Sequence, residues 1–340
     1  SSTIVQKMHE LGVGEINTFT MGFNEPTDEF SDASVVAKHF GTNHRTHSLD
    51  LKPLADFPEV IWHAEEPKIN LLQGFNMSKF VREHVPVVLG GLGGDELFAG
   101  YHIHQWIQGV DYLRQGKWKA FWATIRITGN RWQDLMLCVR QLGKRAVLPY
   151  LPRTWQWALL RHTNPMMDFL QTEVRQQQLH QLDKLKEPVG DLQDYLRHQY
   201  FHGHLSYLLK FEDRNAMRFG LETRVPFADD PRLMDLLFAL PAAQKLQPGE
   251  TKALLRKAQG SVLPPAIRHR QDKVGFIAPT NQWLRSQDDW MAFFDYSSAV
   301  LDTHRIKREK AKFDGMLASD RFTHVLPVLT LALWEQTFFA

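Results

Sequence analysis

The stretch that decides the fold is LGGLGGDELFAGY, residues 89–101. It follows the apolar run PVVL, residues 86–89, which is typical of a short strand that is buried on both faces. Glycine lets a ligand approach the backbone, and open α/β sheets bind ligands just beyond the carboxyl ends of their strands. The stretch therefore predicts either a ligand-binding turn that presents Asp95 and Glu96, or a tight turn into a helix that one of them caps.

The residues before this stretch alternate between helical and strand patterns. Apolar spacing predicts helices over 1–12, 32–40 and 71–84, and strands over 16–23, 44–49 and 86–89. This alternation favours a parallel sheet. After Tyr101 only helical patterns follow, with candidates at 116–126, 132–148, 155–161, 167–182 and 192–210 and a proline-broken helical final third. We therefore expect an α/β region over 1–101 and a helical region over 102–340 that packs against it.

Composition excludes several classes of protein. The chain has 340 residues and a formal net charge of +2, so no global field attracts nucleic acid or a membrane surface. A single cysteine, Cys138, excludes an internal disulfide framework and fits a reducing, cytoplasmic compartment. No apolar run approaches the roughly 20 residues of a membrane span. We expect neither nucleic acid nor membrane as a partner.

Four further stretches carry unusual polar patterns. They are DRNAMRFGLETRVPFAD at 213–229, RHRQDKVGF at 268–276, TFTMG at 18–22 and EEP at 65–67. Each has an ordinary structural explanation when taken alone, such as a buried salt-bridge network for the first and a solvated basic loop for the second. Their order along one chain is what calls for a common explanation.

In order and spacing, these stretches resemble the synthetase domain of the glutamine-dependent asparagine synthetase family. That family carries S-G-G-x-D-S-S, T-F-x-x-G-F, D-E-P, S-G-[EQ]-G-[GS]-D-E-L-F-G-G-Y, D-R-x-S-M-x-x-S-L-E-x-R-V-P-F-L-D and R-x-D-K-x-G-F-x-x-P, with a nearby W-L-R. The matches span most of the chain apart from roughly 102–200. The resemblance implies a parallel-sheet layer of the adenine-nucleotide α-hydrolase (PP-loop) type.

The resemblance also bears on the start of the chain. Ser1 and Ser2 correspond to the last two residues of the S-G-G-x-D-S-S pyrophosphate loop. The first strand, most of that loop and the glutaminase domain are then expected to be absent from this chain. Such a fragment is expected to be inactive alone.

The family's chemistry assigns expected roles to the matched residues. Members of the family activate a carboxylate, usually the aspartate side chain, with ATP, and ammonia from glutamine then displaces AMP. Gly90 and Gly91 correspond to family positions where the backbone lies against the nucleotide. Met21 corresponds to the strand position that contacts adenine, and Ser1 and Ser2 correspond to the end of the pyrophosphate loop. Asp95 matches a Mg²⁺ ligand, and a carboxylate oxygen suits that hard cation.

The remaining expected catalytic residues are Lys273, Glu96 and Arg224. Lys273 matches the lysine that contacts pyrophosphate, a compact charge suited to phosphate. For Arg224, a contact with substrate and an ion pair within the scaffold are equally good interpretations. Asp213 and Arg214 fit a scaffold role better. A homodimer is left open.

Two departures from the family pattern leave the substrate open. Leu92 stands where asparagine-forming members carry Glu or Gln, and Gly90 replaces the usual Ser. Leu92 offers no hydrogen bond to a substrate or an amine. The alternatives are the same adenylation on a different carboxylate, by an amidotransferase or a cyclising synthetase, and a non-catalytic truncated remnant.

Two weaker patterns point elsewhere. Residues 114–131 interleave cations with aromatic rings, which can suit nucleic acid, but the near-neutral charge disfavours this. His198 and His202 lie one helical turn apart, but no third ligand has the proper spacing, so surface or capping roles are favoured.

Overall fold

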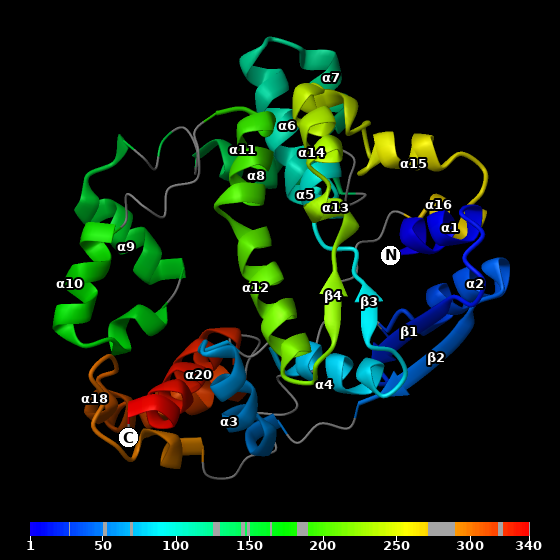
Figure 1. Cartoon of the computed structure of the whole chain (residues 1–340). Coiled ribbons are helices and arrows are strands. Elements are labelled where there is room, and N and C mark those ends of the chain that lie inside the picture. The colour runs from blue at the N-terminus through cyan, green and yellow to red at the C-terminus, as the bar shows by residue number, and fades with distance from the viewer. Residues whose placement is uncertain are drawn as a thin grey trace.

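We analysed a computed structural model of the chain, which describes residues 1–26, 28–49, 53–68, 71–124, 130–143, 147, 150–163, 165–181, 190–270, 290–318 and 322–339. Within these residues, four short strands form two separate parallel pairs. β1 (Asn17–Gly22) pairs with β2 (Asn43–Ser48), and β3 (Val87–Leu89) pairs with β4 (Glu222–Arg224). In Figure 1, β3 and β4 lie side by side, between α12 and the β1–β2 pair.

Helices make up most of the remaining described structure. In the first part of the chain they are α1 (Ser2–Glu10), α2 (Phe30–Phe40), α3 (Pro53–Ala64), α4 (Leu71–Arg82) and α5 (Gly94–Phe98). The middle contains α6 (His102–Arg114), α7 (Trp118–Thr124), α8 (Arg131–Leu142), α9 (Arg153–Thr163), η3 (Pro165–Phe169), α10 (Thr172–Gln181), α11 (Leu192–Phe201) and α12 (His204–Met217). The last part contains α13 (Pro226–Asp229), α14 (Pro231–Ala239), η5 (Ala242–Gln244), α15 (Ala253–Gln259), α16 (Pro265–Arg268), η6 (Trp290–Phe294), α18 (Thr303–Arg308), α19 (Lys310–Ala318) and α20 (Phe322–Phe339).

The expected single parallel sheet is corrected to these two pairs. The three expected strands are present as β1, β2 and β3, and all pairing is parallel. However, the hydrogen-bonded partner of β3 is β4, which lies in the stretch that was expected to be helical or a charged network. β4 has only three residues and precedes Pro226, so it is too short to display an alternating pattern.

Helix α4 joins the two strand pairs. Its Phe80 and Met77 pack with Met21 of β1 on one side and with the cluster around Val81 on the other. That second cluster also contacts Phe19 of β1 and Val88 of β3. The two pairs therefore share one apolar layer, although each has its own hydrogen-bonded ladder.

Two expected helices are broken in the structure. The helix expected over 192–210 is split into α11 and α12 at Gly203, a residue with low helix propensity. The helix expected over 167–182 is split into η3 and α10, because Gln171 donates its backbone N–H to the Val300 carbonyl at 2.8 Å. In the second case a long-range contact overrides the local pattern.

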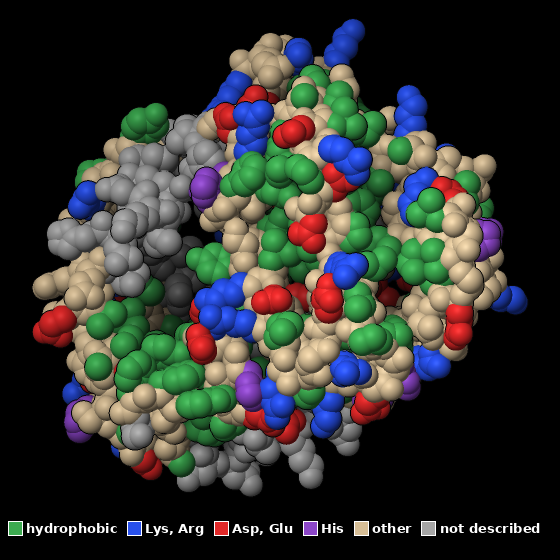
Figure 2. Space-filling model, in the orientation of Figure 1, with side chains coloured by type: hydrophobic (Ala, Val, Ile, Leu, Met, Phe, Trp, Pro, Cys, Tyr) green, Lys and Arg blue, Asp and Glu red, His purple; other side chains and the backbone are tan. Residues whose placement is uncertain are grey.

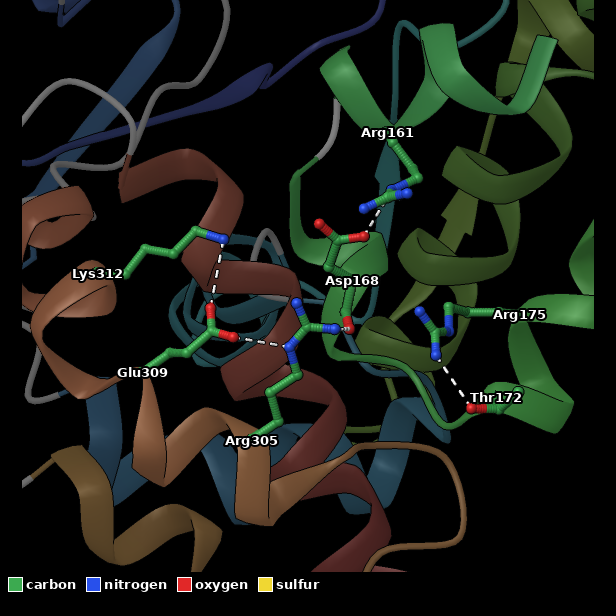
Figure 3. Close-up of polar contacts among 7 residues, drawn as sticks. All are labelled: Arg161, Asp168, Thr172, Arg175, Arg305, Glu309 and Lys312. Atoms are coloured by element: carbon green, nitrogen blue, oxygen red, sulfur yellow. Dashed lines mark hydrogen bonds and ion pairs between the residues drawn. The ribbon is translucent and has the colours of Figure 1, made fainter. Parts of the chain in front are cut away.

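Polar contacts bind the middle helices to the C-terminal ones, as Figure 3 shows. Arg305 of α18 donates to the Asp168 carbonyl at 3.0 Å and to Glu309 Oε1 at 2.8 Å. The Asp168 carboxylate pairs with Arg161 of α9 at 2.6 Å. Since the Arg305 guanidinium also lies over the Phe169 ring, this cluster covers the edge of the apolar core formed by η3, α19 and α20.

Surface charge on the face that carries α12, β3 and β4 is mixed. Figure 2 shows basic and acidic side chains interspersed there. In the described part of the chain, no helix combines the length and the apolar character needed to cross a membrane.

Candidate active site

The glycine-rich turn leaves the carboxyl end of β3 and leads directly into α5. Gly90 donates its N–H to the Arg224 carbonyl of β4 at 2.8 Å, which extends the ladder by one bond. Gly93 has φ +86°, a left-handed value that a side chain rarely adopts, and it is the N-cap of α5. Asp95 and Glu96 lie in the first turn of α5 and neither caps it, so the simple capping interpretation is wrong.

Two glycines allow close approach on different sides of the turn. A Cβ atom at Gly91 would lie 2.9 Å from the Ser1 backbone nitrogen, so the residues matched to the pyrophosphate loop lie directly against the turn. A Cβ atom at Gly90 would lie 2.8 Å from Glu212 Oε1, a carboxylate that comes from α12. The structure thus brings Ser1 and Gly91 together, and it adds an acidic residue beside Gly90.

Asp95 is held by a lysine from a distant segment. Lys252 Nζ lies 2.8 Å from Asp95 Oδ1, and both side chains are mostly buried. Lys252 is the N-cap of α15 and has φ +55°, an uncommon conformation for a residue with a side chain. A Cβ atom at Gly100 would overlap both Asp95 Oδ1 and Lys252 Cε, so a side chain at this position would force the ion pair to shift.

Glu96 points into the protein interior beneath the turn. It is 2% exposed and accepts a hydrogen bond from the Tyr101 hydroxyl at 2.9 Å. Burial raises the pKa of Glu96 and, more strongly, that of Tyr101. The buried His104 accepts the Tyr101 backbone N–H at 3.3 Å, and burial lowers its pKa to about 4. These three residues support the turn from its buried side.

The other expected site residues have different positions. Arg224 is exposed and pairs with Glu222 at 2.7 Å, while its carbonyl accepts the Gly90 N–H. Met21 is buried at the end of β1, so its side chain packs in the core. Lys273 lies outside the described residues, as do Pro279 and the stretch at 283–285. The contact of Lys273 with pyrophosphate stays a prediction.

Residues around Glu65 and Glu66 contribute to the scaffold. Arg214 of α12 pairs with Glu65 at 2.9 Å and donates to the Ala64 carbonyl. Lys210 pairs with Glu66. These contacts fix the end of α3 against α12, in line with the scaffold role that suits Arg214.

The donor set suits a magnesium ion shared with a nucleotide. The described residues contain no cluster of three or more His, Cys, Asp or Glu side chains that could hold a metal. His198 and His202 therefore do not belong to such a cluster among these residues. Among the described residues, Asp95 and Glu212 present carboxylates next to the turn. Mg²⁺ commonly binds through one or two carboxylates and takes its other ligands from substrate phosphates and water, which this arrangement fits.

Lys252, Gly100 and Glu212 were missed by the sequence analysis. Lys252 and Asp95 lie far apart in the chain, and no local pattern links them. Glu212 had a usable signal, because it lies three residues before the buried Asn215 and four before the buried Ala216 on the inward face of α12. A charged residue on such a face indicates a specific role or partner.

Comparison with known proteins decides the family. The model of the family described as asparagine synthase matches residues 1–335. The chain belongs to the asparagine synthase family. The matched residues include the glycine turn, β4 and both parts of the chain, and the match confirms the resemblance seen in the motifs.

Similar members of the asparagine synthase family come from diverse organisms. A putative glutamine-hydrolysing asparagine synthetase of Mycobacterium bovis is 30% identical over 353 aligned residues, covering 94% of this chain and 50% of the relative. Glutamine-hydrolysing asparagine synthetase 1 of Bacillus subtilis is 26% identical, covering 81% of this chain and 44% of the relative. A yeast asparagine synthetase is 31% identical over 28% of this chain. The chain spans about half the length of the first two relatives.

Proposed function

We propose that this chain forms the synthetase part of an ATP-dependent, amide-forming ligase. It adenylates a carboxylate, with the aspartate side chain as the first candidate, and releases pyrophosphate. Ammonia, supplied by glutamine hydrolysis in a separate glutaminase domain, then displaces AMP. The division at about residue 101 into an ATP-binding α/β region and a helical region belongs to this proposal.

The observation that carries the proposal is the position of the glycine turn between Ser1 and Asp95. Ser1 lies against Gly91 on one side, and Asp95 follows in the first turn of α5. Backbone that is free of side chains at the carboxyl end of a parallel strand suits a nucleotide phosphate chain. This arrangement supports the roles expected for Ser1, Ser2, Gly90 and Gly91. Met21, at the end of β1, is proposed to contact adenine.

Charge in the proposed site is balanced by the chain itself. Bound magnesium would neutralise phosphate charge and orient the leaving pyrophosphate. Lys252 holds the Asp95 carboxylate in place and limits its repulsion of phosphate, while Lys273 is proposed to contact pyrophosphate. Arg224 is proposed to contact substrate at the end of β4, and Glu96 to keep the first turn of α5 in position through Tyr101.

A different carboxylate is the second candidate substrate, and the environment of Leu92 favours it. Leu92 packs against the apolar cluster that contains Leu97 and Phe98. It therefore offers no polar group to the aspartate amino-acid moiety. The same adenylation on another acid, by an amidotransferase or a cyclising synthetase, accommodates this change.

Substitutions at the turn test the proposal through ATP–pyrophosphate exchange. Asp95→Asn should abolish carboxylate-dependent exchange, and Lys273→Ala should lower it by roughly 10²-fold, as the loss of a charge-stabilising donor does. Gly100→Ala should also reduce exchange, because the new methyl group displaces the Asp95–Lys252 pair. Gly14→Ala is the matched control, since nothing lies within 4 Å of its Cβ position. Wild-type exchange in Asp95→Asn would refute the site assignment.

A further inference from the structure

Helix α8 exposes apolar side chains and buries polar ones. Trp132, Met136 and Val139 are 77%, 65% and 52% exposed, and their i, i+4, i+7 spacing places them on one face of the helix, which we call the α8 stripe. The opposite face buries Asp134 and Gln141 and packs against α6. A helix at an ordinary protein surface has the reverse arrangement, so the α8 stripe is suited to an apolar environment that covers it.

Helix α7 shares a core with α8 and also exposes large aromatic rings. Phe121 of α7 and Cys138 of α8 pack in one cluster, and a Cβ atom at Gly109 of α6 would lie 3.7 Å and 3.3 Å from them. Trp118 and Trp122, one turn apart on α7, are 61% and 54% exposed. Both helices therefore expose tryptophan away from this core, and α7 lies at the top edge of the molecule in Figure 1.

The stretch of sequence that contains α7 and α8 is strongly basic. Between Asp111 and Asp168 it has ten Lys and Arg residues and a single acidic residue, Asp134, which is 0% exposed. Its net charge is therefore +9, with His counted as neutral. The expectation that no membrane surface is a partner rests on the net charge of the whole chain, +2, which conceals this concentration of charge. On α8 itself, the exposed Arg131 and Arg140 lie on either side of the α8 stripe.

The combination of aliphatic and basic side chains discriminates among the possible occupants of this face. Single-stranded nucleic acid binds in basic grooves where its bases stack on aromatic rings, whereas Met136 and Val139 have no ring. Protein interfaces are depleted in lysine, whereas the exposed Lys117 and Lys119 lie at the start of α7. An anionic lipid surface fits both features, because Trp is enriched at membrane interfaces and Lys and Arg bind anionic headgroups.

We propose that α7 and α8 form a docking surface for an anionic phospholipid bilayer. The α8 stripe and the tryptophans of α7 enter the boundary between headgroups and acyl chains, with both helices lying along the membrane surface. The surrounding Lys and Arg side chains extend to the negatively charged headgroups. This inference goes beyond the proposed ligase activity and does not depend on it.

Sedimentation with lipid vesicles tests the docking surface in the protein as expressed from its own gene. One set of vesicles contains phosphatidylcholine alone, and the other contains about 30% phosphatidylserine, which supplies the negative surface potential. Binding to the second set should be much stronger and should weaken at high salt, because salt screens the attraction. A blue shift of tryptophan fluorescence on binding should report entry of the rings into the lipid.

Two double variants separate the apolar contribution from the electrostatic one. Trp132→Ala with Met136→Ala removes most of the α8 stripe, and Arg131→Gln with Arg140→Gln removes the charges beside it. Phe339→Ala is the control, since it removes a ring of α20 that is 74% exposed. Far-UV circular dichroism and ATP–pyrophosphate exchange should match the wild type in all three, because these residues lie outside the proposed active site.

We expect the stripe variant to bind phosphatidylserine vesicles roughly tenfold more weakly or worse, through lost apolar burial. The charge variant should lose roughly 25-fold on the same vesicles, at about fivefold per cation, and should be unchanged on phosphatidylcholine. Phe339→Ala should stay within about twofold of the wild type, because a ring away from the docking surface contributes no burial.

Three results would overturn the docking surface. The first is a wild-type protein that binds neither set of vesicles or both equally, and the second is wild-type binding by both double variants. The third is binding to a single-stranded oligonucleotide that the stripe variant loses, without binding to vesicles, which would assign the face to nucleic acid.

Discussion

At the scale of single residues, the buried polar group beneath the glycine turn makes stability depend on pH. The ordinary histidine pKa is 6.5, and burial lowers that of His104 to about 4. Between these values the unfolded chain binds a proton that the folded protein does not. The free energy of unfolding therefore falls as the pH falls from 6.5 towards 4, by on the order of 3 kcal/mol in full.

This dependence can be measured by chemical denaturation at pH 7.5 and pH 4.5. The wild type should lose more stability than His104→Gln, whose side chain is uncharged at both values. The Glu96 carboxyl has a raised pKa and acts in the opposite direction, but it is present in both proteins and cancels in the comparison. Equal losses in the two proteins would show that His104 is protonated in the folded state.

The proximity of residues was predictable where a motif marked them and not where the fold supplied the contact, and the chemical roles stay predictions. Ser1, Gly91 and Asp95 could be placed at one site because family motifs mark them. Lys252 and Glu212 reach the turn from α15 and α12. The position of Glu212 on the inward face of α12 indicates a specific role, but no local signal links either residue to the turn. The left-handed conformation of Lys252 is likewise set by the tertiary structure.

At the scale of elements, helix α20 has the clearest energetic role. It contributes Val325, Leu326, Val328, Leu329 and Ala332 to one apolar cluster and Leu333 to a second, which also contains Ile61 and Leu72. The helix therefore joins the C-terminal core to α3 and α4, which pack against α12.

Truncation of one buried side chain in α20 tests this role. Leu329 is 1% exposed, so Leu329→Ala should lower the free energy of unfolding by roughly 2–5 kcal/mol through lost burial and a cavity. Phe339→Ala is the control within the same helix, because Phe339 is 74% exposed, and it should change stability by less than about 0.5 kcal/mol. Equal effects measured by urea denaturation would contradict the packing described for α20.

Elements with a clear period were predicted from sequence to within a few residues, as α2, α4 and β1 show. The failures have physical causes. β4 owes its existence to pairing with β3, and η3 ends where Gln171 bonds to Val300. Such long-range backbone bonds leave no trace in a local pattern.

At the scale of the whole molecule, both parts of the chain build the proposed nucleotide site at the glycine turn. The turn, β3 and Asp95 come from the first 101 residues, while β4, Glu212 and Lys252 come from the rest. Neither region alone contains the complete proposed site. Membership of the asparagine synthase family, established over residues 1–335, supports the same view.

The most direct test is ATP–pyrophosphate exchange by the protein as expressed from its own gene, first with aspartate and then with a panel of other carboxylic acids. We predict exchange that requires Mg²⁺ and a specific carboxylate. Exchange with aspartate would make Leu92 a tolerated change, whereas exchange with another acid alone would select the second candidate substrate. A folded protein that gives no exchange with any acid would contradict the proposed ligase activity.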